Sequence, residues 1–293
     1  MAKISKTIIP TLFATLSSLA MPEDVKPKGV KPTRIVSLDY CADQYVLGLA
    51  ERSQIAAVSM EASLSHSYYK DKVESIRQIR PSTDLILSLN PDLVVKSWAG
   101  DRNLSISLAK LNVPLLEISM SEDQASQKKT IYDISKQKIS MIAGRFGHHE
   151  KAAQLLTNIE NDFKALKAFK PVKGQALYLT PGAFSTGDKT LMNEIIKLAG
   201  FQNYMSQLGY TGWQPIPLER MVEKAPDIMI TGFYDVASAV NFNWGIARHD
   251  FFEKKLNAVT RIDIPGSYLS CSGLFAIPAA KYLRDQYNQK EDQ

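Results

Sequence analysis

The stretch Asp84-Leu-Ile-Leu-Ser-Leu-Asn-Pro-Asp-Leu-Val-Val95 returns later in the chain as Glu219-Arg-Met-Val-Glu-Lys-Ala-Pro-Asp-Ile-Met-Ile230. Each copy begins with an acid, continues through a short helical segment, and reaches Pro-Asp directly before an apolar strand. Pro-Asp is common turn chemistry, so the convergence of two turns is one explanation. The identical spacing over twelve positions favours a repeated architectural unit, and therefore two similar lobes.

Short β-rich runs alternate with helical segments on both sides of the two stretches. Strands are predicted at residues 34–38, 54–58, 91–95, 113–118, 175–179 and 228–230. Helices are predicted at residues 44–50, 84–89 and 191–198, and a polar turn is predicted at residues 39–43. Strands that are separated by helices form parallel βαβ units with helices covering the sheet, so the alternation predicts an α/β fold.

A long helix is predicted between the two halves. Residues 124–146 run without proline, and their apolar positions, such as Ile131 and Ile142, share one helical face. A second helix is predicted at about 150–169. We therefore predict an α/β protein of two Rossmann-like lobes joined by a single long helix, with the ligand cleft between the lobes. The boundaries are a signal peptide at 1–20, a flexible leader at 21–32, an N-terminal α/β lobe at 33–122, the interdomain helix at 123–148, a C-terminal α/β lobe at 149–288 and a tail at 289–293.

The N-terminus has the pattern of an export signal. A basic start, residues 1–6, precedes an apolar and acid-free run at residues 7–20 that ends in small residues. The run is shorter than the roughly 20 residues that span a bilayer, and no cysteine follows the expected cut. We therefore expect a periplasmic protein that is secreted by a signal peptide and carries no lipid anchor.

Charge and cysteine content exclude several classes of protein. The chain has 293 residues, of which 45% are hydrophobic, and its net charge of +5 falls to +3 once Lys3 and Lys6 leave with the signal peptide. So mild a charge argues against nucleic acid as a partner. Two cysteines, Cys41 and Cys271, are too few for a disulfide framework or a four-thiolate zinc site. They form either one disulfide or two buried thiols, and we slightly favour the thiols because their separation in space is unknown.

The order of these segments resembles the periplasmic substrate-binding proteins of ABC importers for vitamin B12, iron-siderophores and haem. The resemblance runs from Arg34 to about Tyr287 and is carried by residues 34–38, 81–95, 111–114, 191–200, 219–230 and 256–259. It implies a monomer that delivers its ligand to an inner-membrane ABC permease and needs no cofactor. It also implies that Asp84 and Glu219 dock the two lobes onto arginines of the permease. The turn at residues 39–41 departs from the common pattern and marks a subgroup.

Aromatic residues gather in the loops that should form the binding site. Ligands of α/β lobes bind at the carboxyl ends of the strands, and nearly every loop predicted there contains an aromatic residue. Aromatic walls suit a large planar or macrocyclic ligand, and arginines suit its carboxylates, catecholates or propionates. Some of these aromatics are expected simply to pack the lobe edges. The candidate ligand-binding residues are Tyr40, Cys41, Glu61, Tyr68, Trp98, Arg102, Phe184, Trp213, Tyr234, Trp244, Arg248 and Tyr268.

The remaining motifs favour a binding protein over an enzyme. The sequence contains no nucleophile elbow, phosphate loop or dinucleotide fingerprint, and no histidine pair spaced for a bare metal ion. His66, in a polar loop, is either a solvated histidine or an axial haem ligand. We therefore predict a periplasmic binding protein that captures an iron-siderophore, with cobalamin and then haem as the alternatives. A secreted hydrolase is the alternative from another class.

Overall fold

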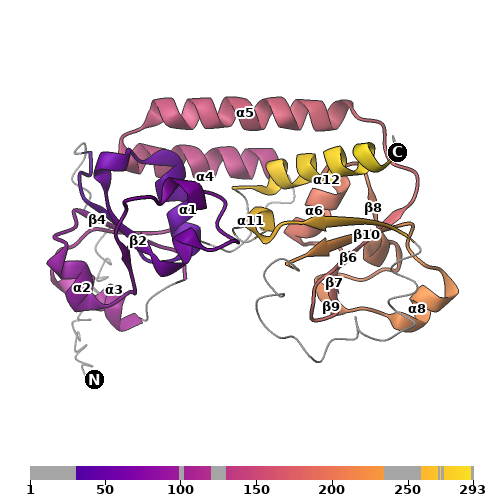
Figure 1. The fold of residues 1–293 in the computed structure, drawn as a ribbon, viewed down its shortest axis with the longest axis horizontal. Coiled ribbons are helices and arrows are strands. Elements are labelled where there is room, and N and C mark those ends of the chain that lie inside the picture. The colour runs from indigo at the N-terminus through magenta and orange to yellow at the C-terminus, as the bar shows by residue number, and fades with distance from the viewer. Residues whose placement is uncertain are drawn as a thin grey trace, which may run out of the picture. The chain divides into compact units, whose positions relative to one another are not determined.

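The computed structural model describes residues 31–98, 102–119, 130–233, 259–269, 271 and 274–291. The predicted signal peptide lies outside these residues, and so does the segment at 234–258. Figure 1 shows two parallel sheets, each accompanied by helices, as the alternating sequence predicts.

The first sheet contains five parallel strands in the order β3-β2-β1-β4-β5. This part of the chain consists, in order, of β1 (Ile35–Ser37), α1 (Tyr40–Leu49), η1 (Arg52–Gln54), β2 (Ile55–Ser59), η2 (Met60–Ser63), η3 (Lys70–Lys72), β3 (Gln78–Ile79), α2 (Thr83–Ser88), β4 (Leu93–Lys96), α3 (Arg102–Lys110) and β5 (Leu115–Glu117). The strand order reverses direction between β1 and β4. In doubly wound sheets, this reversal opens a crevice at the carboxyl ends of the two strands.

The predicted turn at residues 39–43 is wrong. Asp39 is the N-cap of α1, and the helix begins at Tyr40. The Asp39 carboxylate accepts a hydrogen bond from the backbone N–H of Ala42 at 2.9 Å and so satisfies an N–H that has no partner within the helix. The polar residues that suggested a turn therefore form the first turn of a helix.

The second sheet contains four parallel strands in the order β11-β10-β6-β8, and a separate antiparallel ribbon pairs β7 with β9. Its elements, in chain order, are β6 (Gln175–Leu179), β7 (Phe184–Thr186), α6 (Leu191–Leu198), β8 (Gln202–Asn203), α7 (Tyr204–Gln207), β9 (Trp213–Pro215), α8 (Leu218–Glu223), β10 (Ile228–Gly232), β11 (Thr260–Ile264), α11 (Gly266–Leu269) and α12 (Ala276–Glu291). Here the direction of the strand order reverses between β6 and β10.

The two Pro-Asp stretches occupy equivalent places in the two sheets. The Asp92 carboxylate accepts hydrogen bonds from the backbone N–H groups of Thr33 and Arg34, at 2.6 and 2.8 Å, and so joins the start of β4 to the start of β1. The Asp227 carboxylate accepts from the backbone N–H of Gln175 at 2.6 Å and so joins β10 to β6. The sequence repeat is therefore a structural repeat, in which the aspartate holds together the amino ends of the two central strands.

Two helices lie between the sheets in the chain, and the first is shorter than predicted. The chain passes from β5 to β6 through α4 (Ile131–Phe146) and α5 (His149–Ala168). The helix α4 begins at Ile131 because Thr130 caps it in a capping box with Asp133, so its start lies seven residues after the predicted one. Gly147 ends it in a left-handed conformation, with φ at 74°. The helix α5, with 20 residues, is the longer of the two, and it packs against both α4 and α12 (Figure 1).

The largest hydrophobic core is continuous from one sheet to the other. It contains residues of β1, α1, α4 and α5 together with residues of β6, α6 and α12. Two smaller cores cover the opposite faces, one around Val36 and Val94 of the first sheet and one around Leu177 and Met229 of the second. Each sheet therefore has apolar packing on both faces, which is typical of parallel sheets.

Candidate functional site

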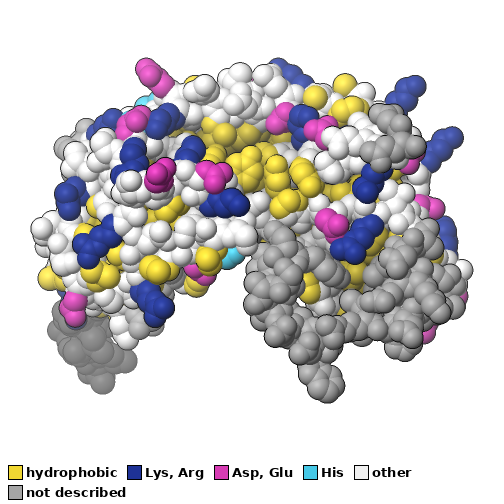
Figure 2. All heavy atoms as spheres, viewed as in Figure 1, with side chains coloured by type: hydrophobic (Ala, Val, Ile, Leu, Met, Phe, Trp, Pro, Cys, Tyr) yellow, Lys and Arg dark blue, Asp and Glu magenta, His cyan; other side chains and the backbone are white. Residues whose placement is uncertain are grey.

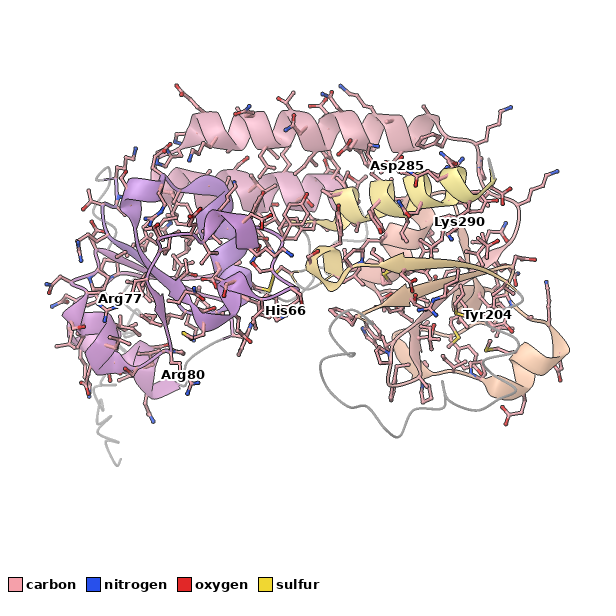
Figure 3. The ribbon with its side chains drawn as sticks, in the orientation of Figure 1. His66, Arg77, Arg80, Tyr204, Asp285 and Lys290 are labelled. Carbon is pink, nitrogen blue, oxygen red and sulfur yellow. A yellow bond between two sulfur atoms is a disulfide. The ribbon has the colours of Figure 1, made fainter. Side chains whose placement is uncertain are left out.

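Three aromatic side chains meet at the carboxyl end of the first sheet, where the strand order reverses. Tyr40 follows β1, Trp98 follows β4, and His66 lies in the loop between η2 and η3 (Figure 3). The Tyr40 ring lies 5.1 Å from the His66 ring, edge to face, and 6.1 Å from the Trp98 ring, measured between centroids. Trp98 is 54% exposed although it is a large apolar side chain. We name Tyr40, His66 and Trp98 the aromatic cluster.

Asp39 fixes the position of Trp98 relative to Tyr40. Its carboxylate is fully buried and accepts hydrogen bonds from the backbone N–H groups of Ser97 and Trp98, at 2.6 and 3.2 Å. The Ser97 hydroxyl donates to the same carboxylate at 2.8 Å. Because Asp39 also caps α1, one side chain joins the loop after β1 to the loop after β4. The spacing of the two rings therefore depends on a buried acid that bonds to the backbone of both loops.

Asp43 and Gln44 hold the other loops in the same way. The Asp43 carboxylate accepts from the backbone N–H and the hydroxyl of Ser59, at 3.1 and 2.6 Å, which fixes the end of β2. The Gln44 amide donates to the Ser67 hydroxyl at 2.9 Å and accepts from the backbone N–H of Tyr69 at 3.0 Å. These bonds fix the loop that carries His66.

Burial raises the pKa of Asp43 to about 7, against the hydrogen bonds from Ser59, which lower it. Its carboxyl in the unfolded chain titrates near 3.8, so the folded protein holds more protons between these two pH values. We therefore expect the free energy of unfolding to fall, through this group, by roughly 2–4 kcal/mol as the pH rises from about 4 to about 7, and to level off above that pH. Asp43→Asn should remove this contribution and be more stable than the wild type at pH 8.

The measurement is urea unfolding of the wild type and Asp43→Asn from pH 4 to pH 8. Asp71→Asn, at an exposed aspartate of η3, is the matched control. The difference in free energy between the wild type and Asp43→Asn should grow with pH, while the difference for Asp71→Asn stays near zero. Parallel curves for all three proteins would show that Asp43 is not a buried acid of raised pKa.

The second sheet contributes its own exposed aromatics. Trp213 on β9 and Phe184 on β7 are 53% and 47% exposed, and both belong to the antiparallel ribbon. The Trp213 ring lies 6.0 Å from the buried Tyr178 ring of β6. Tyr178, Trp213 and Phe233 line a small apolar pocket near the carboxyl ends of β6 and β10. Both sheets thus present aromatic residues at the point where their strand order reverses.

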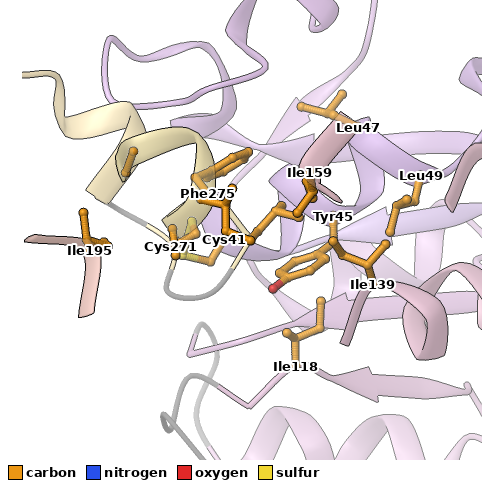
Figure 4. Close-up of a cluster of buried hydrophobic side chains, with 14 of the residues drawn as sticks. Cys41, Tyr45, Leu47, Leu49, Ile118, Ile139, Ile159, Ile195, Cys271 and Phe275 are labelled. Carbon is orange, nitrogen blue, oxygen red and sulfur yellow. A yellow bond between two sulfur atoms is a disulfide. The ribbon is translucent and has the colours of Figure 1, made fainter. Parts of the chain in front are cut away.

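Cys41 and Cys271 form a disulfide, although the sequence slightly favoured two buried thiols. Their Cα atoms lie 5.3 Å apart, and the bond joins α1 to the segment between α11 and α12 (Figure 4). Both residues are buried, and Cys41 lies in the first turn of α1 and not in an exposed loop. Cys41 therefore has no surface with which to contact a ligand, and its assignment to the ligand site is wrong.

Two further candidates pack against each other beside this disulfide. Tyr68 stacks on Phe275, with centroids 4.2 Å apart, and meets the Tyr268 ring edge-on at 5.3 Å. In Figure 2, apolar side chains gather in the middle of the visible face, where the neighbouring ends of α4 and α12 lie in Figure 1. Burial raises the pKa of Tyr68 and of Tyr268, because it removes the solvent that would stabilise their charged forms. Tyr68 and Tyr268 thus join elements on either side of the disulfide. The sequence analysis expected some of the candidate aromatics to have such a packing role.

The other candidates occupy varied places. Glu61 lies half-buried on η2, and Arg102 is the first residue of α3. Tyr234, Trp244 and Arg248 lie outside the described residues. Within those residues, no group of three His, Cys, Asp or Glu side chains is placed to hold a metal ion. No described helix is both long and apolar enough to cross a membrane.

Asp84 and Glu219 lie at equivalent positions. Each is the second residue of a six-residue helix, α2 or α8, and each carboxylate is exposed. Each helix leads through a Pro-Asp turn into a central strand of its sheet, β4 or β10. The structure therefore presents one acid beside each sheet at the same point of the repeated unit.

The positioning residues Asp39, Asp43 and Gln44 were not assigned to the site from the sequence. The available signal was their spacing, since the three polar residues occur in the first seven positions after β1 and all three are buried in the structure. Buried polar side chains in a first helical turn need partners, and here the partners are the neighbouring loops.

The chain belongs to a family of transport proteins. The family model for periplasmic binding proteins matches residues 35–241, which is most of the chain. The protein is therefore a substrate-binding component of the ABC-importer type and not an enzyme, and its family places it in the periplasm. No curated protein sequence matches the chain.

Solved structures share the fold at low sequence identity. The periplasmic haem-binding protein BhuT, in complex with two haems, is 18% identical with a TM-score of 0.63, over 87% of this chain and 97% of its own. The periplasmic haem-binding protein HutB of Vibrio cholerae is 21% identical with a TM-score of 0.62, over 87% and 98%. CeuE of Helicobacter pylori, in a nickel–histidine complex, is 16% identical with a TM-score of 0.56, over 87% and 83%. These similarities confirm the predicted two-lobed α/β fold.

Proposed function

We propose that the protein captures an iron chelate at the aromatic cluster and delivers it to an ABC permease, and that the chelate is haem. The observation that carries this proposal is the meeting of Tyr40, His66 and Trp98 where the first sheet's strand order reverses. An exposed tryptophan beside a tyrosine offers a flat apolar surface, which suits a planar macrocycle.

We rank haem ahead of the siderophore that the sequence put first, and the pair Tyr40 and His66 supports this order. Tyrosine and histidine are both axial ligands of haem iron in proteins, and here their rings lie 5.1 Å apart. The descriptions of BhuT and HutB as haem-binding proteins agree with this choice. An iron-siderophore is second, because the aromatic cluster contains no arginine or lysine to meet its catecholates. Cobalamin is third.

Trp213 and Phe184 supply the facing wall in this proposal. They are exposed aromatics of the second sheet's ribbon, and the proposal is that a chelate held by the aromatic cluster also contacts them. Asp84 and Glu219 are proposed as the two docking acids. One exposed carboxylate at the same point of each repeated unit provides two negative charges that could pair with a cationic surface of the permease.

Trp98→Ala is expected to weaken haem binding at least tenfold, because large buried contacts of tryptophan dominate most binding energies. His66→Ala should change the Soret absorption band of the complex, because it removes an axial ligand or its neighbour. The measurement is a titration of the mature protein with haemin, a ferric tricatecholate and cyanocobalamin, followed by absorption and tryptophan fluorescence. His149→Ala, at an exposed histidine of α5, is the control and should bind as the wild type does.

The outcomes separate the ligands. Saturable binding of haemin with a changed Soret band in His66→Ala supports the haem proposal. If the protein bound only the tricatecholate or only cyanocobalamin, that chelate would replace haem as the proposed ligand. Saturable binding of none of the three chelates would overturn the proposed function.

A further inference from the structure

A small apolar pocket lies at the carboxyl end of the second sheet. It is lined by Tyr178 of β6, by Phe233 directly after β10, and by Tyr268 and Leu269 of α11, which follows β11. The second sheet reverses its strand order between β6 and β10, so this pocket corresponds to the position of the aromatic cluster on the first sheet. Carboxyl ends at such a reversal are where α/β sheets bind ligands.

The walls of the pocket are apolar or aromatic throughout. Leu191, Met192 and Ile195 of α6 form one side, and Cys271 and Ala276 lie opposite. Trp213, which is 53% exposed, also lines the pocket. No charged side chain lines the pocket, and its polar side-chain groups are two tyrosine hydroxyls and one indole N–H, so it favours an uncharged and largely apolar group.

The backbone next to the pocket holds an uncommon conformation. Phe233 has a φ of 63°, which is rare for a bulky side chain and costs of order 1–3 kcal/mol. Gly232 precedes it, and a Cβ atom there would collide with the Tyr178 hydroxyl. The absence of a side chain at Gly232 thus lets β10 approach Tyr178 and end in the turn that places Phe233 at the pocket.

The volume of the pocket matches a single ring. It measures about 160 Å³, and an engineered apolar cavity of about 150 Å³ is known to bind benzene. Aromatic walls prefer a ring that they can meet edge-on or offset over an aliphatic group of equal size. The pocket is too small for a whole chelate, since sites for drug-sized ligands measure roughly 300–1,000 Å³.

We propose that this pocket receives the apolar edge of the transported chelate, one flat unsaturated ring with its small substituents. The inference rests on the proposed function, and it adds an orientation. If the chelate is haem, the vinyl-bearing edge enters the pocket between α6 and α12, and the propionates point away from it. The pocket would then select chelates that have one uncharged, flat edge.

The first arm of the test uses a probe and needs no chelate. Fluorobenzene binding to the mature protein is followed by ¹⁹F NMR, in competition with benzene and with cyclopentane. Saturable binding is expected, with benzene the better competitor by at least threefold. Leu191→Trp and Ala276→Leu fill the pocket from two sides and should each weaken fluorobenzene binding at least tenfold. Leu208→Trp, at an exposed leucine that does not line the pocket, should change it less than twofold.

The second arm uses chelates. Haemin is compared with the iron deuteroporphyrin that has sulfonates in place of the two vinyl groups, which should bind at least tenfold more weakly because a charged edge cannot enter an apolar pocket. Leu191→Trp should weaken haemin binding at least fivefold and abolish the difference between the two porphyrins. Thermal unfolding midpoints near that of the wild type establish that each variant is folded.

Each outcome bears on one proposal. Absence of saturable fluorobenzene binding, or equal competition by cyclopentane, overturns the ring pocket whatever chelates bind. Equal affinity of the two porphyrins overturns the orientation. The protein could bind fluorobenzene, lose that binding in the two filling variants, and yet bind no chelate. This result would support the ring pocket and overturn the proposed function.

Discussion

The double variant Cys41→Ser, Cys271→Ser is expected to unfold with a free energy about 3–5 kcal/mol below that of the wild type. The disulfide joins residues 230 positions apart, and the loss of loop-closure entropy in the unfolded chain grows with that separation. For so long a loop the entropic model gives about 5 kcal/mol, and measured values are commonly lower. The measurement is urea unfolding under non-reducing conditions. The chain has no other cysteine, so no alternative disulfide can form during unfolding.

The reduced wild type is the matched control for this variant. Reduction should lower its stability to that of the double variant, and the double variant should not respond to reductant. The stacking of Tyr68 on Phe275 remains in both proteins, so the difference reports the covalent link and not the loss of the aromatic contacts. A loss below about 1 kcal/mol in both proteins would show that the disulfide does not constrain the unfolded chain as the model requires.

The double variant Asp84→Arg, Glu219→Arg is expected to lose ligand uptake by at least 100-fold while its ligand affinity stays within twofold of the wild type. Each substitution places a cation where we propose that the permease presents arginines, and juxtaposed like charges cost several kcal/mol at an interface. Both acids are exposed and lie on α2 and α8, and neither helix contributes a residue to the aromatic cluster. The measurement is uptake by proteoliposomes that contain the cognate permease, together with a binding titration of the isolated protein.

A variant of equal charge serves as the control. Glu74→Arg, Glu150→Arg reverses two other exposed acids and leaves the net charge equal to that of the docking variant. It should transport as the wild type does. Normal uptake by Asp84→Arg, Glu219→Arg would show that the docking role is wrong, and equal loss in both double variants would assign the effect to net charge.

Local pattern explains most of what the sequence predicted correctly about the fold. The strand at 175–179 and the helix at 191–198 were predicted with the bounds that β6 and α6 have, because each is a short apolar segment with clear turn residues beside it. The Pro-Asp repeat identified the two sheets because its aspartates make the same backbone contacts in each. The errors are at helix starts, where Asp39 and Thr130 act through side-chain caps that resemble turn residues in a sequence.

The sequence by itself determined the α/β alternation, the repeated unit and the presence of aromatics at strand ends, because these follow from patterns within a few residues. Only the tertiary structure decided which aromatics have a free surface. Tyr40 and Trp98 come together because Asp39 bridges their loops, whereas Tyr68 packs against Phe275 and Tyr268, and Tyr268 also lines the pocket of the second sheet. The disulfide was decided in the same way, since the 5.3 Å between two Cα atoms 230 positions apart depends on packing between α1 and the segment before α12. Distances between remote segments are set by the whole core, and no local pattern contains them.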